Sequence, residues 1–147
     1  MLIGTYHHAI DAKNRIFIPS KWRSSFGDTI FLTQGLFYPD EKCLYGMSVT
    51  EWDQFCAKFA SLPITGSFSN TVKRRLFSVA TECDIDKQGR ILVPQNLLSI
   101  CDIKDNAILV GIGNRFEIWN DTEYVSLSET DKNRYMESMR KLEELGI

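Results

Sequence analysis

Two short motifs carry the side chains of this sequence that are best suited to bind a partner. Asp11 is followed four residues later by Arg15, and Asp86 is followed at the same spacing by Arg90. Each motif continues with isoleucine and ends in proline, and the second copy lies 75 residues after the first. A guanidinium group can fork onto two acceptors of a phosphate or a guanine. The repeat indicates one structural unit used twice.

Basic and polar side chains surround both arginines. Arginine can bind guanine O6 and N7, whereas lysine mainly neutralises phosphate. The alternative is that each aspartate and arginine form an ion pair that fixes a turn, and both interpretations can hold together. Candidate DNA-binding residues are Lys13, Asn14, Arg15, Lys87, Gln88 and Arg90, the candidate orienting residues are Asp11 and Asp86, and the candidate phosphate contacts are Lys21 and Arg23.

Each motif is predicted to form a tight turn that leads into a short strand. Aspartate can hydrogen-bond the backbone two residues further on, and Asn14 and Gly89 occupy the position best suited to a positive φ. The residues at 15–18 and 90–93 are rich in β-branched and large apolar types, which favours strands. Alternation then places each arginine on the face opposite the isoleucine that follows it.

The remaining chain repeats one order of predicted elements: strand, turn, strand, short helix, strand, strand, helix. Thr50 and Thr122 are the predicted signals for the start of the last helix in each half. We expect an α+β domain with pseudo-twofold symmetry, in which closing the halves into one barrel removes exposed sheet edges. The predicted boundaries are 1–147 for a single domain, 1–62 and 75–127 for the repeat halves, and about 129–145 for a C-terminal helix.

Several segments outside the motifs have recognisable patterns. Residues 36–42 are predicted to form a loop with exposed aromatic side chains, and residues 63–70 connect the halves before a helix at 71–80. Two helical stripes are apolar. The first is predicted to face the core and the second to pack on the domain or on a neighbour; they consist of Trp52, Phe55, Cys56, Phe59 and Leu62, and of Tyr135, Met139 and Leu142 with Met136 and Leu145 beside them.

Composition and charge narrow the class of protein. The 147 residues are 44% hydrophobic and 24% charged, as in ordinary globular domains, and the net charge is −2. Positive charge nevertheless collects around the motifs, with +3 over residues 1–27 and +2 over residues 71–94. Such an asymmetry is compatible with a basic face that attracts phosphate. The first residues lack the pattern of a signal peptide, so we expect a cytoplasmic protein without a membrane partner.

Catalytic and metal-binding alternatives receive little support. His7 and His8 are adjacent on a predicted strand and point to opposite faces, so they cannot easily share one ion. Cys83 stands beside Asp84, but no Gly-rich phosphate loop or Ser/His/Asp spacing is present. The cysteines are scattered and are expected to be reduced thiols. We therefore expect no enzyme activity, no metal, no cofactor and no small-molecule substrate.

The two motifs, together with residues 78–94 and 111–119, closely resemble the MraZ proteins over residues 1–125. The resemblance implies a swapped-hairpin barrel of two fused halves similar to the AbrB-type regulators. It further implies a ring-shaped homo-oligomer in the cytoplasm and nucleoid, which binds double-stranded DNA at short tandem repeats upstream of the division and cell-wall gene cluster, including its own promoter, and acts as a repressor. The alternative is a ring-forming scaffold or antitoxin-like module that binds protein. Asn14 stands where glycine is commoner, and neither residues 36–42 nor the tail beyond Tyr124 receives a family role.

Overall fold

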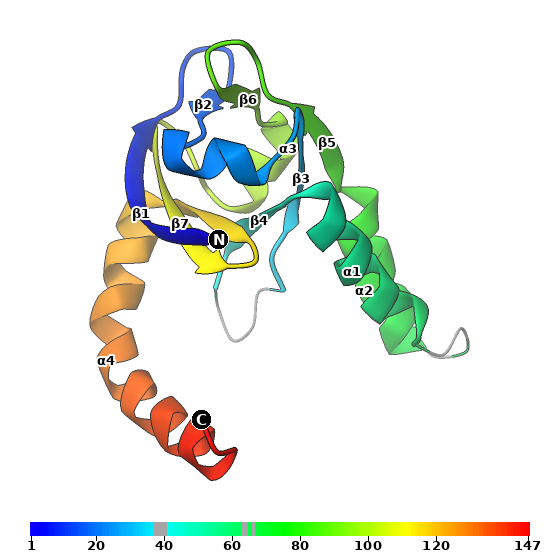
Figure 1. Ribbon diagram of the computed structural model, residues 1–147, viewed down its shortest axis with the longest axis vertical. Helices are drawn as coiled ribbons and strands as arrows, with labels where there is room; N and C mark the ends of the chain where they lie inside the picture. Colours follow the sequence, from blue (N-terminus) through cyan, green and yellow to red (C-terminus); the bar gives the residue numbers. More distant parts are fainter. Residues whose placement is uncertain (37–40, 63–64, 66) are drawn as a thin grey trace.

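The computed structural model describes residues 1–36, 41–62, 65 and 67–147 (Figure 1). Its strands are β1 (Leu2–Ala9), β2 (Arg15–Phe17), β3 (Thr29–Gln34), β4 (Cys43–Met47), β5 (Thr81–Asp84), β6 (Arg90–Leu92), β7 (Asn106–Gly113) and β8 (Phe116–Asn120). Its helices are the 3₁₀ helix η1 (Ser20–Ser25) and the α-helices α1 (Val49–Ala60), α2 (Ser67–Ser78), α3 (Gln95–Ile100) and α4 (Asp121–Glu144).

The main sheet is antiparallel and is shared between the two halves of the chain. Its order is β1-β7-β8-β4-β3-β5, and β2 pairs with β6 in a separate ribbon. The strands β1, β3 and β4 of the first half correspond to β5, β7 and β8 of the second half. When each strand is exchanged for its counterpart, the reversed order is identical to the original one, so the sheet has pseudo-twofold symmetry. Each half thus gives its first strand to the other: β1 pairs with β7, and β5 pairs with β3. The halves are interlocked, so neither can leave without breaking the sheet.

The expected α+β class is confirmed, but the main sheet is open. Strands β1 and β5 occupy its opposite ends, and in the described part of the chain no hydrogen bond of the sheet joins them. The expected closure of both halves into one barrel is therefore not found. The ribbon β2–β6 and the short helices cover the core in its place, since Ile16 and Ile91 are fully buried beneath the ribbon.

The core confirms the alternation predicted for the motif strands. Ile18 and Val93 are buried, whereas Phe17 and Leu92 on the other face are exposed. Trp22 of η1 lies at the centre of the core, where its indole N–H donates to the backbone carbonyl of Ile3 at 2.9 Å. Rings of Tyr6 and Phe116 pack on this indole, with ring centres 5.1 and 5.4 Å away.

Four predicted helix starts differ from the structure. Helix α1 is capped by Ser48, whose hydroxyl accepts from the backbone N–H of Glu51 at 3.3 Å, and not by Thr50. Helix α4 is capped by Asn120 in the same way and not by Thr122. It then runs without interruption to Glu144, so the C-terminal helix does not begin at about 129. In both cases the strand ends so close to the helix that the cap must be supplied at the junction. Helix α2 begins at residue 67, before the predicted 71.

The apolar stripe of α1 faces inward as predicted, although none of its residues is fully buried. Trp52 and Phe55 pack on a second, smaller core that includes Tyr45, Met47 and Trp119. Trp52 stacks on Phe31 of β3 at 5.2 Å and meets Phe77 of α2 edge-on at 5.8 Å. No helix in the described residues is long and apolar enough to cross a membrane. The predicted loop at 36–42 lies mostly outside the described residues, as do 63, 64 and 66 in the connection between the halves.

Candidate nucleic-acid interface

The first motif forms a turn, residues 11–15, that is held by one carboxylate. Oδ1 of Asp11 accepts from the backbone N–H groups of Lys13 and Arg15, both at 2.9 Å. Oδ2 accepts from Nε of Arg15 at 2.7 Å. Asn14 takes the predicted positive φ, 62°. The aspartate therefore fixes both the backbone of the turn and the direction of the arginine, as the ion-pair interpretation expected.

The second motif forms the same turn at residues 86–90. Oδ1 of Asp86 accepts from the backbone N–H groups of Gln88 and Arg90 at 2.9 Å, and Oδ2 accepts from Nε of Arg90 at 2.9 Å. Gly89 takes a φ of 85°. Because one network forms in two different surroundings, the motif itself determines the shape of the turn.

The two turns lie side by side at one end of the molecule (Figure 1). Each is joined to the strand of the other half: the backbone N–H of Ile18 donates to the carbonyl of Gly89 at 2.9 Å, and that of Val93 donates to the carbonyl of Asn14 at 2.8 Å. The antiparallel register of β2 and β6 sets Phe17 opposite Arg90. The two motifs thus become one surface, which we call the paired turns (residues 11–15 and 86–90).

The arginines remain suited to bind an outside group. Both use Nε for the carboxylate, and within the described residues no hydrogen bond is made by their terminal amino groups. The side chains of Arg15 and Arg90 are 30% and 19% exposed. Backbone N–H groups of these arginines, followed by their guanidinium groups, hold the pKa of Asp11 and Asp86 below the ordinary value. The carboxylates are therefore ionised at neutral pH and keep the guanidinium groups in place.

The other candidate residues fall into two groups. Lys13, Lys21, Lys87 and Gln88 are exposed, as a contact to phosphate or base requires. Arg23 is half-buried: its Nε donates to the carbonyl of Ile18 at 2.9 Å, and its guanidinium group lies directly against Gly89. It supports the second turn from behind, a role that sequence reasoning missed.

Asn14 also has a supporting contact that the sequence did not indicate. Its side-chain amide donates to Oε1 of Gln95, at the start of α3 in the other half, at 3.1 Å. The first turn is thus braced by α3 of the second half, and the second turn by η1 of the first half. The contact between Asn14 and Gln95 joins residues 81 positions apart in the sequence. Contacts at such a distance cannot be predicted from a local sequence pattern.

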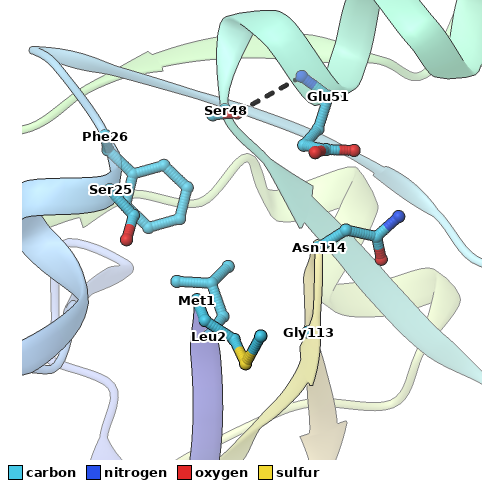
Figure 2. A pocket seen from close by; sticks show the side chains of 8 residues that line it. All are labelled: Met1, Leu2, Ser25, Phe26, Ser48, Glu51, Gly113 and Asn114. Carbon is cyan, nitrogen blue, oxygen red and sulfur yellow. Dashed lines mark hydrogen bonds between the residues drawn. The ribbon is translucent and has the colours of Figure 1, made fainter.

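A hollow of about 420 Å³ lies away from the paired turns, beside the N-terminus (Figure 2). It is lined by Met1, Leu2, Ser25, Phe26, Ser48, Glu51, Gly113 and Asn114. The interaction drawn between these residues is the helix cap, in which the Ser48 hydroxyl accepts from the backbone of Glu51. Its lining pairs no nucleophile with a base, so it offers no set of groups arranged for acyl transfer.

The other candidate residues for catalysis or metal binding are also poorly suited to these roles. Burial raises the pKa of the Cys83 thiol to about 12, and the nearby Asp84 acts in the same direction. A thiol with so high a pKa is a poor nucleophile near neutral pH. His7 is exposed while His8 is half-buried, as expected for neighbours on opposite faces of β1. In the part of the chain that the structure covers, no group of three or more His, Cys, Asp or Glu side chains could hold a metal ion.

Taken together, these features define a two-repeat α+β protein that displays paired arginine turns at one end. The family described as "MraZ protein, putative antitoxin-like" matches residues 1–75 and again residues 76–144. The chain is 43% identical to "Transcriptional regulator MraZ" of Clostridium acetobutylicum over 149 residues and 40% identical to that of Caldicellulosiruptor bescii over 148, with 100% of each chain covered. This chain belongs to the MraZ family.

The relatives' names describe a transcriptional regulator and not an enzyme, in agreement with the sequence analysis. Among solved structures, the solution structure of PHS018 from Pyrococcus horikoshii is 14% identical. It covers 80% of this chain and 88% of its own, with a TM-score of 0.36, a similarity too low to characterise the fold.

Proposed function

We propose that this chain regulates transcription by binding double-stranded DNA through the paired turns. The observation that carries the proposal is that two equivalent turns present Arg15 and Arg90 beside one two-stranded ribbon. The major groove of B-DNA is wide enough to admit such a ribbon, and arginine bound to guanine is the commonest specific contact there. The name of the relatives, transcriptional regulator, supports the same function.

Each side chain has a distinct part in this proposal. Arg15 and Arg90 read bases with their terminal amino groups, while Asp11 and Asp86 hold them in position. Asn14 and Arg23 keep the two turns in shape. The exposed contacts to phosphate and to base edges come from Lys13, Lys21, Lys87 and Gln88.

The proposal extends to the target and to the assembly. The DNA site is a set of short tandem repeats upstream of the division and cell-wall gene cluster, including the gene's own promoter, and occupancy by the protein in the nucleoid represses transcription. Several copies in a ring-shaped homo-oligomer raise the apparent affinity by roughly 10²- to 10⁴-fold through multivalency. The exchange of β1 and β5 between the halves supports a swapped-hairpin origin of the fold, similar to the AbrB-type regulators.

A second candidate follows from the antitoxin-like description of the family. In that case the molecule is a scaffold or antitoxin-like module that binds a protein, and the paired turns are dispensable. The two candidates differ in one measurable respect, because only the first requires the arginines of the turns for activity.

The test compares binding to the gene's own upstream DNA with binding to scrambled DNA of equal length across a salt series. Replacing Arg15 or Arg90 by alanine should weaken binding to the upstream fragment by roughly 5- to 150-fold, the worth of one bidentate base contact, and should leave the fold intact. Arg140→Ala, on the exposed end of α4, is the matched control and should bind like the parent. If Arg15→Ala unfolds the protein, the arginine is only structural and its reading role is wrong.

A lysine variant separates phosphate contacts from base contacts. Lys13→Ala should reduce the slope of log K against log salt by about one unit and weaken binding to both DNA fragments alike. Selective loss of the upstream fragment would instead show that Lys13 reads sequence. Unchanged binding by all the turn variants would leave the protein-binding candidate.

A further inference from the structure

The outer face of the ribbon formed by β2 and β6 mixes charged and apolar side chains. Residues at alternate positions of a strand share one face, so Arg15 and Phe17 of β2 lie on the same side as Arg90 and Leu92 of β6. The other face carries the two buried isoleucines. Phe17 and Leu92 are 42% and 57% exposed. The core does not need these two side chains, and the proposed base contacts of the arginines leave them without a role.

The register of the ribbon places one apolar side chain beside each arginine. Arg15 lies opposite Leu92, and Phe17 lies opposite Arg90. Residues opposite each other on one face of an antiparallel pair have Cβ atoms roughly 5 Å apart. The guanidinium carbon of Arg90 lies 5.8 Å from the centre of the Phe17 ring. Each half of the chain therefore supplies the arginine of one pair and the apolar side chain of the other, and the outer face presents two similar pairs.

In unmodified DNA, the base edges of the major groove offer only one apolar group to such a side chain. That group is the 5-methyl of thymine, because the other groups exposed there are hydrogen-bond donors and acceptors. A phenylalanine or leucine side chain pressed against a donor or acceptor removes its water without replacing the hydrogen bond, which is unfavourable. The neighbouring arginine finds two acceptors on guanine. Each pair on the ribbon therefore has the chemistry to bind one guanine and one thymine.

We propose that Phe17 and Leu92 determine specificity by packing against thymine methyl groups, each close to the base that the neighbouring arginine binds. This contact presupposes the proposed binding of DNA by the paired turns, and it adds the chemical group that the ribbon recognises. Successive residues on one face of a strand are roughly 6.6 Å apart, which is about two base-pair steps, so both pairs fit over one short stretch of groove. Burial of one methyl group corresponds to roughly a fourfold change in affinity.

Removing the methyl groups from the DNA tests the contact without altering the protein. The gene's own upstream fragment is prepared with deoxyuridine in place of thymidine, which removes the 5-methyl groups and keeps every hydrogen-bonding group of the bases. The parent protein should bind the deoxyuridine fragment at least fourfold more weakly than the thymidine fragment. Equal binding to both, with preference over scrambled DNA retained, would overturn the thymine contact and leave the proposed function intact. No preference of the thymidine fragment over scrambled DNA would refute the proposed function, and the thymine contact with it.

Protein variants assign the effect to the ribbon. Phe17→Ala and Leu92→Ala should each reduce the ratio of the affinities for the thymidine and deoxyuridine fragments, and the double variant should bring this ratio close to one. Phe68→Ala, at an exposed phenylalanine of α2 away from the ribbon, is the matched control and should keep the parent's ratio (Figure 1). If the two side chains only support the arginines, their removal will weaken binding to both fragments alike. An unchanged ratio in the double variant would therefore overturn the proposal, and circular dichroism checks that each variant is folded.

Discussion

The second turn depends on Gly89 for two separable reasons. Its φ of 85° lies in the region that disfavours any side chain, and a Cβ atom at this position would overlap the guanidinium group of Arg23. Two other glycines separate the reasons. Gly113 has a φ of 100° but open space around a Cβ, and Gly27 has open space and no positive φ. A Gly→Ala substitution therefore meets both backbone strain and steric overlap at Gly89, backbone strain alone at Gly113, and neither at Gly27.

The magnitudes follow from these surroundings. Gly27→Ala should be neutral or stabilise by up to about 1 kcal/mol, through the lost freedom of the unfolded chain. Gly113→Ala should cost about 1–2 kcal/mol, the strain of a left-handed residue. Gly89→Ala adds displacement of Arg23, whose Nε bonds the Ile18 carbonyl at 2.9 Å. With that bond lost the total becomes roughly 2–4 kcal/mol. For a chain of this size the midpoint of thermal unfolding falls by roughly 4–16 °C.

Urea and thermal unfolding of the three variants provide the assay. In the background of Arg23→Ala the obstacle is gone, so Gly89→Ala should cost only what Gly113→Ala costs, about 1–2 kcal/mol. If Gly89→Ala is no worse than Gly113→Ala in the parent as well, the guanidinium group moves aside freely. In that case Arg23 does not brace the second turn.

Two further predictions concern titration and thiol chemistry. The pKa values of Asp11 and Asp86 are lowered in the folded state, so the unfolded chain takes up protons at a higher pH than the folded chain. The stability that these carboxylates contribute is therefore fully present above the ordinary aspartate pKa of about 3.9. It is lost as the pH falls through the lowered pKa of the folded state. Asp86→Asn should flatten this acid-side loss in urea unfolding, and an unchanged profile would contradict the pairing. Burial raises the pKa of Cys83 and Cys101 to about 12 and that of Cys43 further. Alkylation followed by mass spectrometry should therefore label half-buried Cys56 first, and rapid labelling of another cysteine would contradict the observed burial.

Interactions close in sequence were predictable. The carboxylate of Asp11 bonds groups two and four residues further on, so the sequence of the motif contains the whole network. The positive φ at Asn14 and Gly89 followed from the same reasoning, since few residues adopt it. Burial of Ile16 and Ile18 followed from the period of a strand. In each case the interacting groups lie within five residues of one another, so the local sequence is enough to predict the interaction.

Interactions between the halves were not predictable in the same way. One local feature was also missed: Thr50 has the chemistry of a helix cap, but β4 ends at Met47 and places Ser48 at the start of the helix instead. Arg23 was expected to face phosphate, and its position behind Gly89 depends on a strand contributed by the other half. Closure of the sheet was expected because exposed edges are unfavourable. In the structure a second ribbon and the helices cover the core without such closure.

Local interactions determine the shape of each paired turn, and long-range interactions determine how the two turns are placed relative to each other. Asp11 and Asp86 each set the shape of their own turn, whereas the backbone bonds of Ile18 and Val93 set where the turns stand relative to each other. A change at Asp86 should thus disturb one arginine. A change that loosens β2 against β6 should move both arginines together, because that ribbon is the physical link between them. The proposed recognition of DNA by two arginines at a fixed separation requires both the local and the long-range bonds, so duplication of the motif alone would not provide it.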